Sequence, residues 1–187
     1  LGVLVERCPR PEGRWPAAAL NDLLVLLGAG EAMPAVVEAL DRCGLWLRLL
    51  PEWEGVRTLP SRDRAHVHTV DRHLVRTVVE ASRLTTSVRR ADLLLLAALL
   101  HDIGKGHPGD HCVTGAEMVR PIAGRLGCDD DDVATLSRIV RHHLLFARAS
   151  TRRDPDDAAT ASGLVAILDG DPEALDVLAA LTVADAI

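Results

Sequence analysis

Two histidines and two aspartates in this chain have the types and positions expected of metal ligands: His73, the adjacent pair His101-Asp102, and Asp185. The pair directly follows the apolar run Leu93–Leu100, where burying two polar side chains costs free energy unless both have partners. A divalent ion would satisfy both, because imidazole supplies a neutral nitrogen and aspartate supplies an oxygen that can bridge two ions. Taken alone, the pair could instead be a surface helix end, where a histidine suits the helix dipole.

The other two candidates also have a structural alternative. His73 stands beside Leu74, near the edge of the apolar face of a predicted helix, so it is either directed into a cleft between helices or a core histidine. Asp185 is the one acid in the apolar stretch Leu181–Asp185, and a buried carboxylate is costly unless it is paired or bound to a metal. Alternatively, Asp185 has no functional role and merely lies close to the chain end.

Further residues could complete such a site. His111 and one member of the pair His142-His143 could hold a second ion or bind a phosphate. We expect the pair to lie in the middle of a helix, where neighbouring residues point about 100° apart, so that one of the two faces the cleft. Lys105, in the glycine-flanked segment Gly104–Gly109, is either a phosphate ligand or a solvated lysine.

Candidate substrate contacts lie on either side of these residues. His66 precedes His73 by seven residues, about 10 Å along a helix, so it is a substrate contact or a supporting residue rather than a ligand of the same ion. His68 is expected to face solvent. Arg152 and Arg153 could dock an acidic partner or the substrate phosphate, since arginine matches phosphate with two hydrogen bonds. A solvated loop is their alternative.

Helices must position these residues. Hydrophobic residues make up 48% of the 187-residue chain but aromatic residues only 2%, so the core is built from Leu, Val and Ala, of which Leu and Ala favour helix. The pattern shows no strand and predicts an all-α fold. The expected helices are Trp15–Leu27, Glu31–Leu50 with a break near Gly44, Ala65–Leu84, Val88–Leu100, Cys112–Leu126, Asp129–Ala149, Ser162–Leu168 and Pro172–Ile187.

Local signals refine these elements. Val88–Leu100 is apolar enough to be buried on all sides, and Gly104–Gly109 reads as a loop. Gly127 suits a helix C-terminus, and Pro172 suits a helix start. The acidic run Asp129–Asp132 resembles a metal site, but carboxylates in a first helical turn favour the helix dipole, and we interpret it that way.

Composition excludes some functions. The net charge of −6 provides no basic field for nucleic acid, and no apolar run approaches the about 20 residues that span a membrane. The cysteines at positions 8, 43, 112 and 128 form no C-x-x-C pair, so we expect reduced thiols in a cytoplasmic protein.

A soft boundary near Pro60 divides the chain into a helical lead-in and linker, residues 1–60, and a main domain, residues 61–187. The chain does not begin with Met and stops at Ile187 within an apolar helical pattern, which suggests a fragment of a longer protein.

The order His73, His101-Asp102, Asp185 across helices resembles the HD phosphohydrolase superfamily. The closer resemblance is to the HD domain of the bifunctional uridylyltransferase/uridylyl-removing enzymes, and it runs from about Trp46 to the C-terminus. The segments that carry it are Pro51–Trp53, His66–His73, Leu100–Gly106, Gly109–His111, Val140–Leu145, Arg152–Asp154 and Leu181–Asp185.

This resemblance implies an all-α HD bundle with an N-terminal helical extension. It also implies hydrolysis of a nucleotidyl group, UMP or AMP, from a tyrosine of the PII nitrogen-regulatory protein, with one or two manganese or magnesium ions. Carried over by position, His73, His101, Asp102 and Asp185 are metal ligands.

The family motif also implies roles for three further residues. His111 and His143 become additional catalytic and metal-binding histidines, with His143 preferred over His142 because the motif histidine directly precedes Leu-Leu. Lys105 would contact phosphate.

Some features depart from the family. His68 stands where its members usually have Tyr, and the nucleotidyltransferase motif and effector-sensing domains are absent, so we expect removal but not attachment of the nucleotidyl group. A general HD nucleotide phosphohydrolase and a non-catalytic regulatory HD module remain alternatives. The sequence gives no indication of the oligomeric state.

Overall fold

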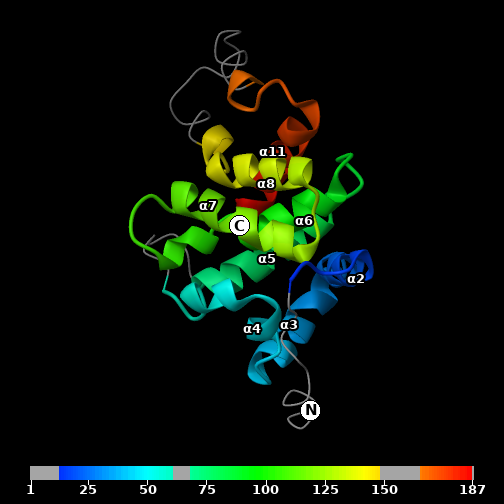
Figure 1. Ribbon diagram of the computed structural model, residues 1–187, viewed down its shortest axis with the longest axis vertical. Coiled ribbons are helices and arrows are strands. Elements are labelled where there is room, and N and C mark those ends of the chain that lie inside the picture. The colour runs from blue at the N-terminus through cyan, green and yellow to red at the C-terminus, as the bar shows by residue number, and fades with distance from the viewer. Residues whose placement is uncertain (1–12, 61–67, 148–164, 187) are drawn as a thin grey trace.

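The computed structural model describes residues 13–60, 68–147 and 165–186, and the regular elements of these ranges are helical (Figure 1). Pro60 and Thr69 form an isolated antiparallel bridge. The all-α prediction is therefore confirmed. The elements are α2 (Ala17–Leu27), η1 (Gly30–Ala32), α3 (Met33–Arg42), α4 (Trp46–Leu49), η2 (Pro51–Gly55), α5 (Val70–Ser82), α6 (Ala91–Leu100), η3 (Ile103–Gly106), α7 (His111–Leu126), α8 (Asp130–Arg141) and α11 (Pro172–Asp185).

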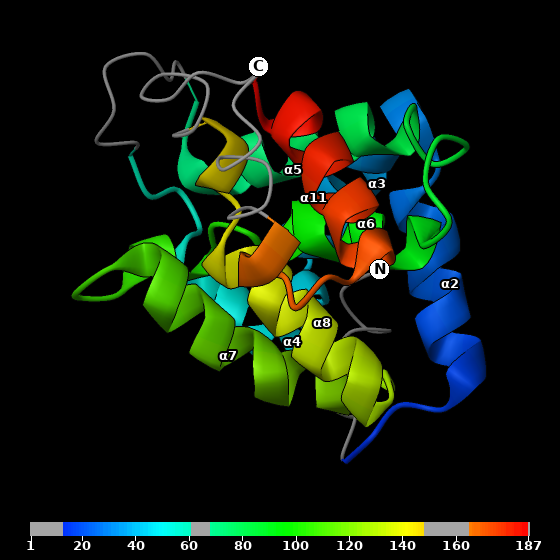
Figure 2. The same ribbon diagram turned by 90° about the horizontal axis from the view of Figure 1, so that it is seen from above.

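Helix α6 is the centre of the bundle. Every residue from Leu93 to Leu100 is buried, as its apolar sequence predicts, and α5, α8, α11 and α2 pack around it. Figure 2 shows α11 lying beside α5 and α6. Each fully buried leucine contributes about 1.5–3 kcal/mol relative to an exposed one. The His-Asp pair at the end of α6 is therefore anchored by the best-packed part of the molecule.

Helices α7 and α8 form a hairpin that packs on one side of this core (Figure 2). Gly127 ends α7 with a φ of 106°, a left-handed conformation that glycine adopts without strain. The Asp129 side chain then accepts a hydrogen bond from the backbone N–H of Asp132 and caps α8. The interpretation of Asp129–Asp132 as helix N-terminal charge is confirmed.

Two of the predicted helix limits are wrong. The helix expected from Ala65 begins at Val70, because Thr69 has an extended backbone and pairs with Pro60. The helix expected to run from Asp129 to Ala149 ends at Arg141, and His142 leaves the helical conformation with φ −114° and ψ 16°. His142 and His143 consequently lie in a turn, not in the middle of a helix.

The segment after the His-Asp pair was predicted as a loop, but it begins with the 3-10 helix η3. Two glycines let it approach other backbone closely. A Cβ on Gly104 would lie 2.3 Å from the carbonyl oxygen of His111, and a Cβ on Gly106 would lie 2.1 Å from the carbonyl oxygen of Gly55. This turn is therefore held between the start of α7 and η2.

The N-terminal helices pack against α5 and α6. The chain breaks at Gly44, as predicted, with a φ of 73°, and Trp46 and Trp53 are buried with their rings edge to face. No single described helix is long and apolar enough to cross a membrane. The bent pair Ala17–Leu27 and Gly30–Arg42, with 99° between its members, meets that test by length and composition when taken together.

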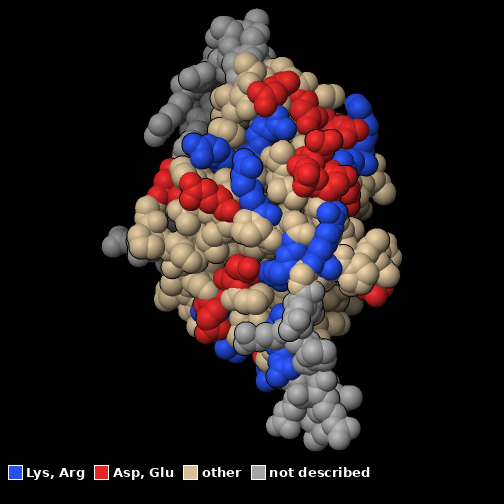
Figure 3. Space-filling view, viewed as in Figure 1, with Lys and Arg blue, Asp and Glu red and all other residues tan. Residues whose placement is uncertain are grey.

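Charge on the face of the molecule in Figure 3 is mixed: acidic and basic side chains lie next to each other, and neither sign dominates the described surface there. Some charged side chains of the described structure pair directly. Arg90, for example, donates to Asp92 at 2.7 Å and to Asp132 at 2.6 Å.

Candidate metal centre

Three of the predicted ligands meet in a buried cluster between α5, α6 and α11. His73 Nε2 lies 2.8 Å from Asp185 Oδ1, and His101 Nε2 lies 3.2 Å from the same oxygen. The two imidazole nitrogens are 3.3 Å apart. Asp102 Oδ2 faces this group, 3.8 Å from His73 Nε2 and 3.6 Å from His101 Nε2. We call these three side chains around Asp102 Oδ2 the Oδ2 half of the centre.

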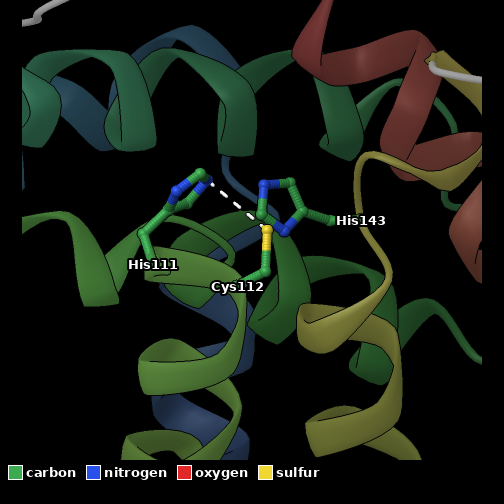
Figure 4. A group of neighbouring side chains, drawn as sticks. All are labelled: His111, Cys112 and His143. Atoms are coloured by element: carbon green, nitrogen blue, oxygen red, sulfur yellow. Dashed lines mark hydrogen bonds between the residues drawn. The ribbon is translucent and has the colours of Figure 1, made fainter. Parts of the chain in front are cut away.

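The other oxygen of Asp102 faces a second group. Asp102 Oδ1 is 3.6 Å from His111 Nε2 and 3.6 Å from His143 Nε2. Cys112, the neighbour of His111, brings its Sγ to 3.6 Å from His111 Nε2. Figure 4 shows the sulfur of Cys112 lying between the rings of His111 and His143. We call His111, Cys112 and His143, together with Asp102 Oδ1, the Oδ1 half.

The ligand set comes from elements far apart in sequence. Helix α5 contributes His73, the end of α6 contributes His101 and Asp102, the first turn of α7 contributes His111 and Cys112, the turn after α8 contributes His143, and the last turn of α11 contributes Asp185. Helices α5 and α11 pack on α6, and α7 packs on η3, which directly follows the His-Asp pair. The bundle thus fixes the cluster without contributions from long loops among the described residues.

Backbone carbonyls orient two of the imidazoles. His101 Nδ1 lies 3.0 Å from the carbonyl oxygen of Ala98, and His143 Nδ1 lies 2.7 Å from that of Val140. A carbonyl only accepts, so Nδ1 carries the proton in each ring and donates it. In a neutral His143 ring Nε2 then presents its lone pair toward Asp102, which is the tautomer that a metal ligand requires. His101 Nε2 instead lies 3.2 Å from Asp185 Oδ1, to which it donates a hydrogen bond.

A cation fits this arrangement. The Asp102 side chain is almost fully buried, and its Oδ1 accepts no hydrogen bond from any described group. A buried carboxylate oxygen without a donor is costly, and a divalent ion between it and the facing imidazoles would remove that cost. The donor set of neutral nitrogens and carboxylate oxygens is one that divalent transition metals and Mn²⁺ or Mg²⁺ accept.

The protonation states also suit a cation. Burial raises the pKa of Asp102, but the charges of His101 and Lys105 outweigh it and hold the pKa below its usual value. Burial likewise opposes ionisation of Asp185, yet hydrogen bonds from His101 and His73 hold its pKa far below the usual range. Both carboxylates are therefore ionised at neutral pH.

The histidines of the two halves differ. Burial, together with the nearby charge of His101, lowers the pKa of His143 to about 4, and burial lowers the pKa of His111. Burial also opposes protonation of His101, but the charge of Asp102 and the hydrogen bond to Asp185 raise its pKa overall. The Oδ1 half therefore offers neutral nitrogens at neutral pH.

Lys105 lies at the edge of the centre. It belongs to η3, its side chain is 28% exposed, and its Nζ forms an ion pair with Asp102 Oδ2. Of the two interpretations of Lys105, the ion pair argues against the solvated loop lysine, since the structure brings Lys105 to the cluster.

The structure describes only some of the remaining predicted residues. His68 is exposed, as expected, and His142 is only partly buried while His143 is buried. His66, Arg152 and Arg153 lie outside the described residues. Cys112 was not predicted as a site residue. Its position next to His111, at the start of a helix, was the signal that could have identified it.

Comparison with known proteins agrees with the resemblance to HD domains. The family model of the HD domain matches residues 70–185, which include every side chain placed in the two halves. A bifunctional uridylyltransferase/uridylyl-removing enzyme of Mycobacterium tuberculosis is 56% identical over 185 residues, covering 99% of this chain and 22% of the relative.

Enzymes of the same name from other bacteria also match. The one from Streptomyces coelicolor is 53% identical over 92% of this chain and 21% of the relative, and the one from Corynebacterium glutamicum is 38% identical over 98% and 27%. The chain spans about a fifth to a quarter of the length of these curated relatives.

Proposed function

The chain belongs to the HD domain family, and from that premise we propose that it is a metal-dependent phosphodiester hydrolase. Its substrate would be the PII nitrogen-regulatory protein carrying a nucleotidyl group on a tyrosine, and the reaction would release the nucleoside monophosphate. The names of the relatives, which include uridylyl-removing activity, favour UMP over AMP as the released group.

One observation carries this proposal: the two oxygens of the buried Asp102 carboxylate face two separate sets of imidazoles. Such a carboxylate can bridge two ions, as two-metal phosphoryl-transfer centres require. We propose that His73, His101, Asp102 and Asp185 hold one ion, and that His111 and His143 hold a second with Asp102. Manganese or magnesium is the expected metal.

A bound divalent ion would polarise the phosphoryl oxygens and lower the pKa of a coordinated water. The residues of the chain prepare the site for this. Asp102 and Asp185 are ionised, and the ring orientation of His101 and His143 is fixed by backbone carbonyls. The geometry therefore needs little rearrangement when substrate binds.

Lys105 would bind the substrate phosphate. Its ammonium group already lies beside Asp102, so it can balance negative charge on a phosphoryl group at the same edge of the centre. The leaving tyrosinate is stable enough to depart without strong acid catalysis. We retain His66, Arg152 and Arg153 as proposed substrate contacts, and residues 61–187 as the proposed catalytic domain after a lead-in at 1–60.

The experiment uses the purified 187-residue chain, stripped with chelator and reloaded with Mn²⁺ or Mg²⁺. Uridylylated PII, adenylylated PII, and free UTP and ATP are offered in parallel, and released nucleotide is separated by chromatography. We expect metal-dependent release from modified PII and none from Asp102→Asn. Hydrolysis of the free nucleotides alone would establish the general nucleotide phosphohydrolase instead, and no hydrolysis of any substrate with either metal would refute the proposal.

A further inference from the structure

We propose that the Oδ1 half is a site for a thiophilic divalent ion of the zinc class, with the Cys112 thiolate as a ligand beside His111, His143 and Asp102 Oδ1. The inference builds on the proposed function, in which His111 and His143 already hold an ion. It adds a sulfur ligand and a different ion for this half.

Three of the donor–donor distances in the Oδ1 half match a tetrahedral zinc site. Zinc bonds of about 2.0–2.3 Å in tetrahedral geometry separate the donor atoms by about 3.3–3.8 Å. Asp102 Oδ1 to His111 Nε2, Asp102 Oδ1 to His143 Nε2, and His111 Nε2 to Cys112 Sγ are each 3.6 Å. Ligand atoms of His111, Cys112 and His143 all lie within 4.8 Å of one another. Little movement would be needed to receive an ion.

Two features hold the sulfur in place. The backbone N–H of Cys112 donates to Asp110 Oδ1 at 2.8 Å, which fixes the residue in the first turn of α7. The side chain is buried and directed between the two imidazoles (Figure 4). The N-terminus of a 16-residue helix also favours the thiolate form that metal binding requires.

An independent observation points to a cation here. Asp102 Oδ1 is buried and accepts no hydrogen bond within the described structure, and it is aimed at this group of donors. On binding, the ion forms a bond to sulfur, and the thiol proton leaves to solvent.

The donor types then decide which ion binds. Two imidazoles, one thiolate and one carboxylate suit zinc, whereas magnesium prefers oxygen ligands and water. The Oδ2 half has no sulfur donor in the described structure, and its imidazoles and carboxylates suit manganese or magnesium. The two halves would therefore select different ions although they share one aspartate.

Cobalt substitution tests the sulfur ligand directly. Chelator-treated full chain is titrated with Co²⁺, because cobalt bound to a thiolate gives a charge-transfer band in the near ultraviolet. We expect this band in the wild type, its loss on adding Zn²⁺, and its persistence in excess Mg²⁺. Cys112→Ser should lack the band and bind Zn²⁺ at least 10–100-fold more weakly, the loss that even an outer-shell partner brings.

Matched controls are Cys43→Ser and Cys128→Ser, which remove thiols outside the centre and should leave the band unchanged. Should Cys112→Ser fail to fold, the wild type still provides a test. Zn²⁺ should protect Cys112, but not Cys43, from alkylation as mapped by mass spectrometry of peptides. A wild type without the band, a band that survives in Cys112→Ser, or equal alkylation of Cys112 with and without Zn²⁺ would overturn the inference.

The outcomes separate this inference from the proposed function. If the chain hydrolyses modified PII but shows no thiolate band, the inference of a sulfur ligand is refuted and the proposed function is retained. If the chain shows the thiolate band but hydrolyses none of the substrates, the inferred metal site is retained and the proposed function is refuted.

Discussion

The two halves of the metal centre share Asp102 but are built differently. In the Oδ2 half the donors already contact one another, with His73 and His101 both within 3.2 Å of Asp185 Oδ1. In the Oδ1 half the His111 and His143 nitrogens stand 3.6 Å from Asp102 Oδ1, which accepts no hydrogen bond in the described structure. The polar atoms of the Oδ2 half can therefore form hydrogen bonds with one another, whereas Asp102 Oδ1 in the Oδ1 half needs a cation as its partner.

The halves also differ in how the chain assembles them. The Oδ2 half joins α5, α6 and α11 and depends on packing between the middle and the end of the chain. The Oδ1 half joins the end of α6 to the α7–α8 hairpin, whose members are closer in sequence. A disturbance of one helix contact should therefore affect the two halves unequally.

Asp102→Asn should have the largest effect, because it weakens both halves at once. The amide keeps the shape of the side chain but removes the charge and one acceptor. Several kcal/mol of electrostatic stabilisation would be lost, and each 1.4 kcal/mol is about tenfold, so we expect hydrolysis to fall by about 10³-fold or more. The assay is nucleotide release from modified PII, with far-ultraviolet circular dichroism to confirm the fold. Activity within tenfold of the wild type would contradict the shared role of Asp102.

Variants that change only one half should show whether the two halves bind metal independently. Asp185→Asn removes a charge from the Oδ2 half only, and His143→Gln removes a nitrogen ligand from the Oδ1 half only. We expect each to lose one bound ion while keeping the other, with a smaller loss of activity than Asp102→Asn. Metal content after dialysis, measured by mass spectrometry, reports this. Loss of all metal from both variants would mean that the halves act as one site.

Gly104→Ala should disturb the contact between the His-Asp turn and α7. The new Cβ would lie 2.3 Å from the carbonyl oxygen of His111, so the backbone must move. Overpacking of this kind costs about 1–3 kcal/mol of unfolding free energy. We expect that loss in urea unfolding, together with weaker metal binding in the Oδ1 half, because His111 moves away from Asp102.

The matched control is Gly124→Ala in α7, the helix that Gly104 approaches, where a Cβ meets nothing within 4 Å. A helical glycine replaced by alanine should gain about 0.5–1 kcal/mol. Equal stability changes in the two variants would show that the close approach at Gly104 has no energetic importance.

Protonation in the metal-free protein should also distinguish the halves. Folding lowers the pKa of His143 from 6.5 to about 4, so as pH falls the unfolded chain takes up this proton before the folded protein does. The stability of the folded protein should therefore decrease as pH drops from about 6.5 to about 4. His101 has a raised pKa, so its contribution is present below 6.5 and is lost as pH rises through the raised value.

Histidine resonances followed by NMR in chelator-treated protein measure both titrations. We expect the resonance with the lowest pKa to disappear in His143→Gln. A His143 ring that titrates near 6.5 would contradict the assigned environment of the Oδ1 half.

Much of this site could be predicted because its residues carry strong local signals. The apolar run before His101-Asp102 predicted a buried helix, and that helix is the core of the bundle. The convergence of Asp185 with His73 could not be derived from periodicity, since it depends on how α11 packs against α5. Resemblance to a known family, not local pattern, supplied that contact.

The main error in the predicted elements was at His142-His143. No Gly or Pro marks the end of α8, so the helical pattern appeared to continue. The helix ends there because His143 is buried at the centre and its Nδ1 bonds back to the carbonyl of Val140, a tertiary interaction that overrides helix propensity. Cys112 was missed for a related reason: its position beside His111 is a weak signal, which gains weight only when the fold brings His143 to it.

The smallest expected effect is that of His142→Gln, the neighbour of a proposed ligand. His142 is only partly buried and belongs to neither half, whereas His143 Nε2 lies 3.6 Å from Asp102 Oδ1. Surface substitutions of this kind usually change stability by less than about 0.5 kcal/mol. We therefore expect metal content, the cobalt spectrum and hydrolysis to match the wild type within about twofold, a difference of about 0.4 kcal/mol. The same change at position 143 should remove one ion. If His142→Gln instead lost metal and His143→Gln did not, the backbone turn after α8 would present the wrong histidine, and the Oδ1 half as drawn would be wrong.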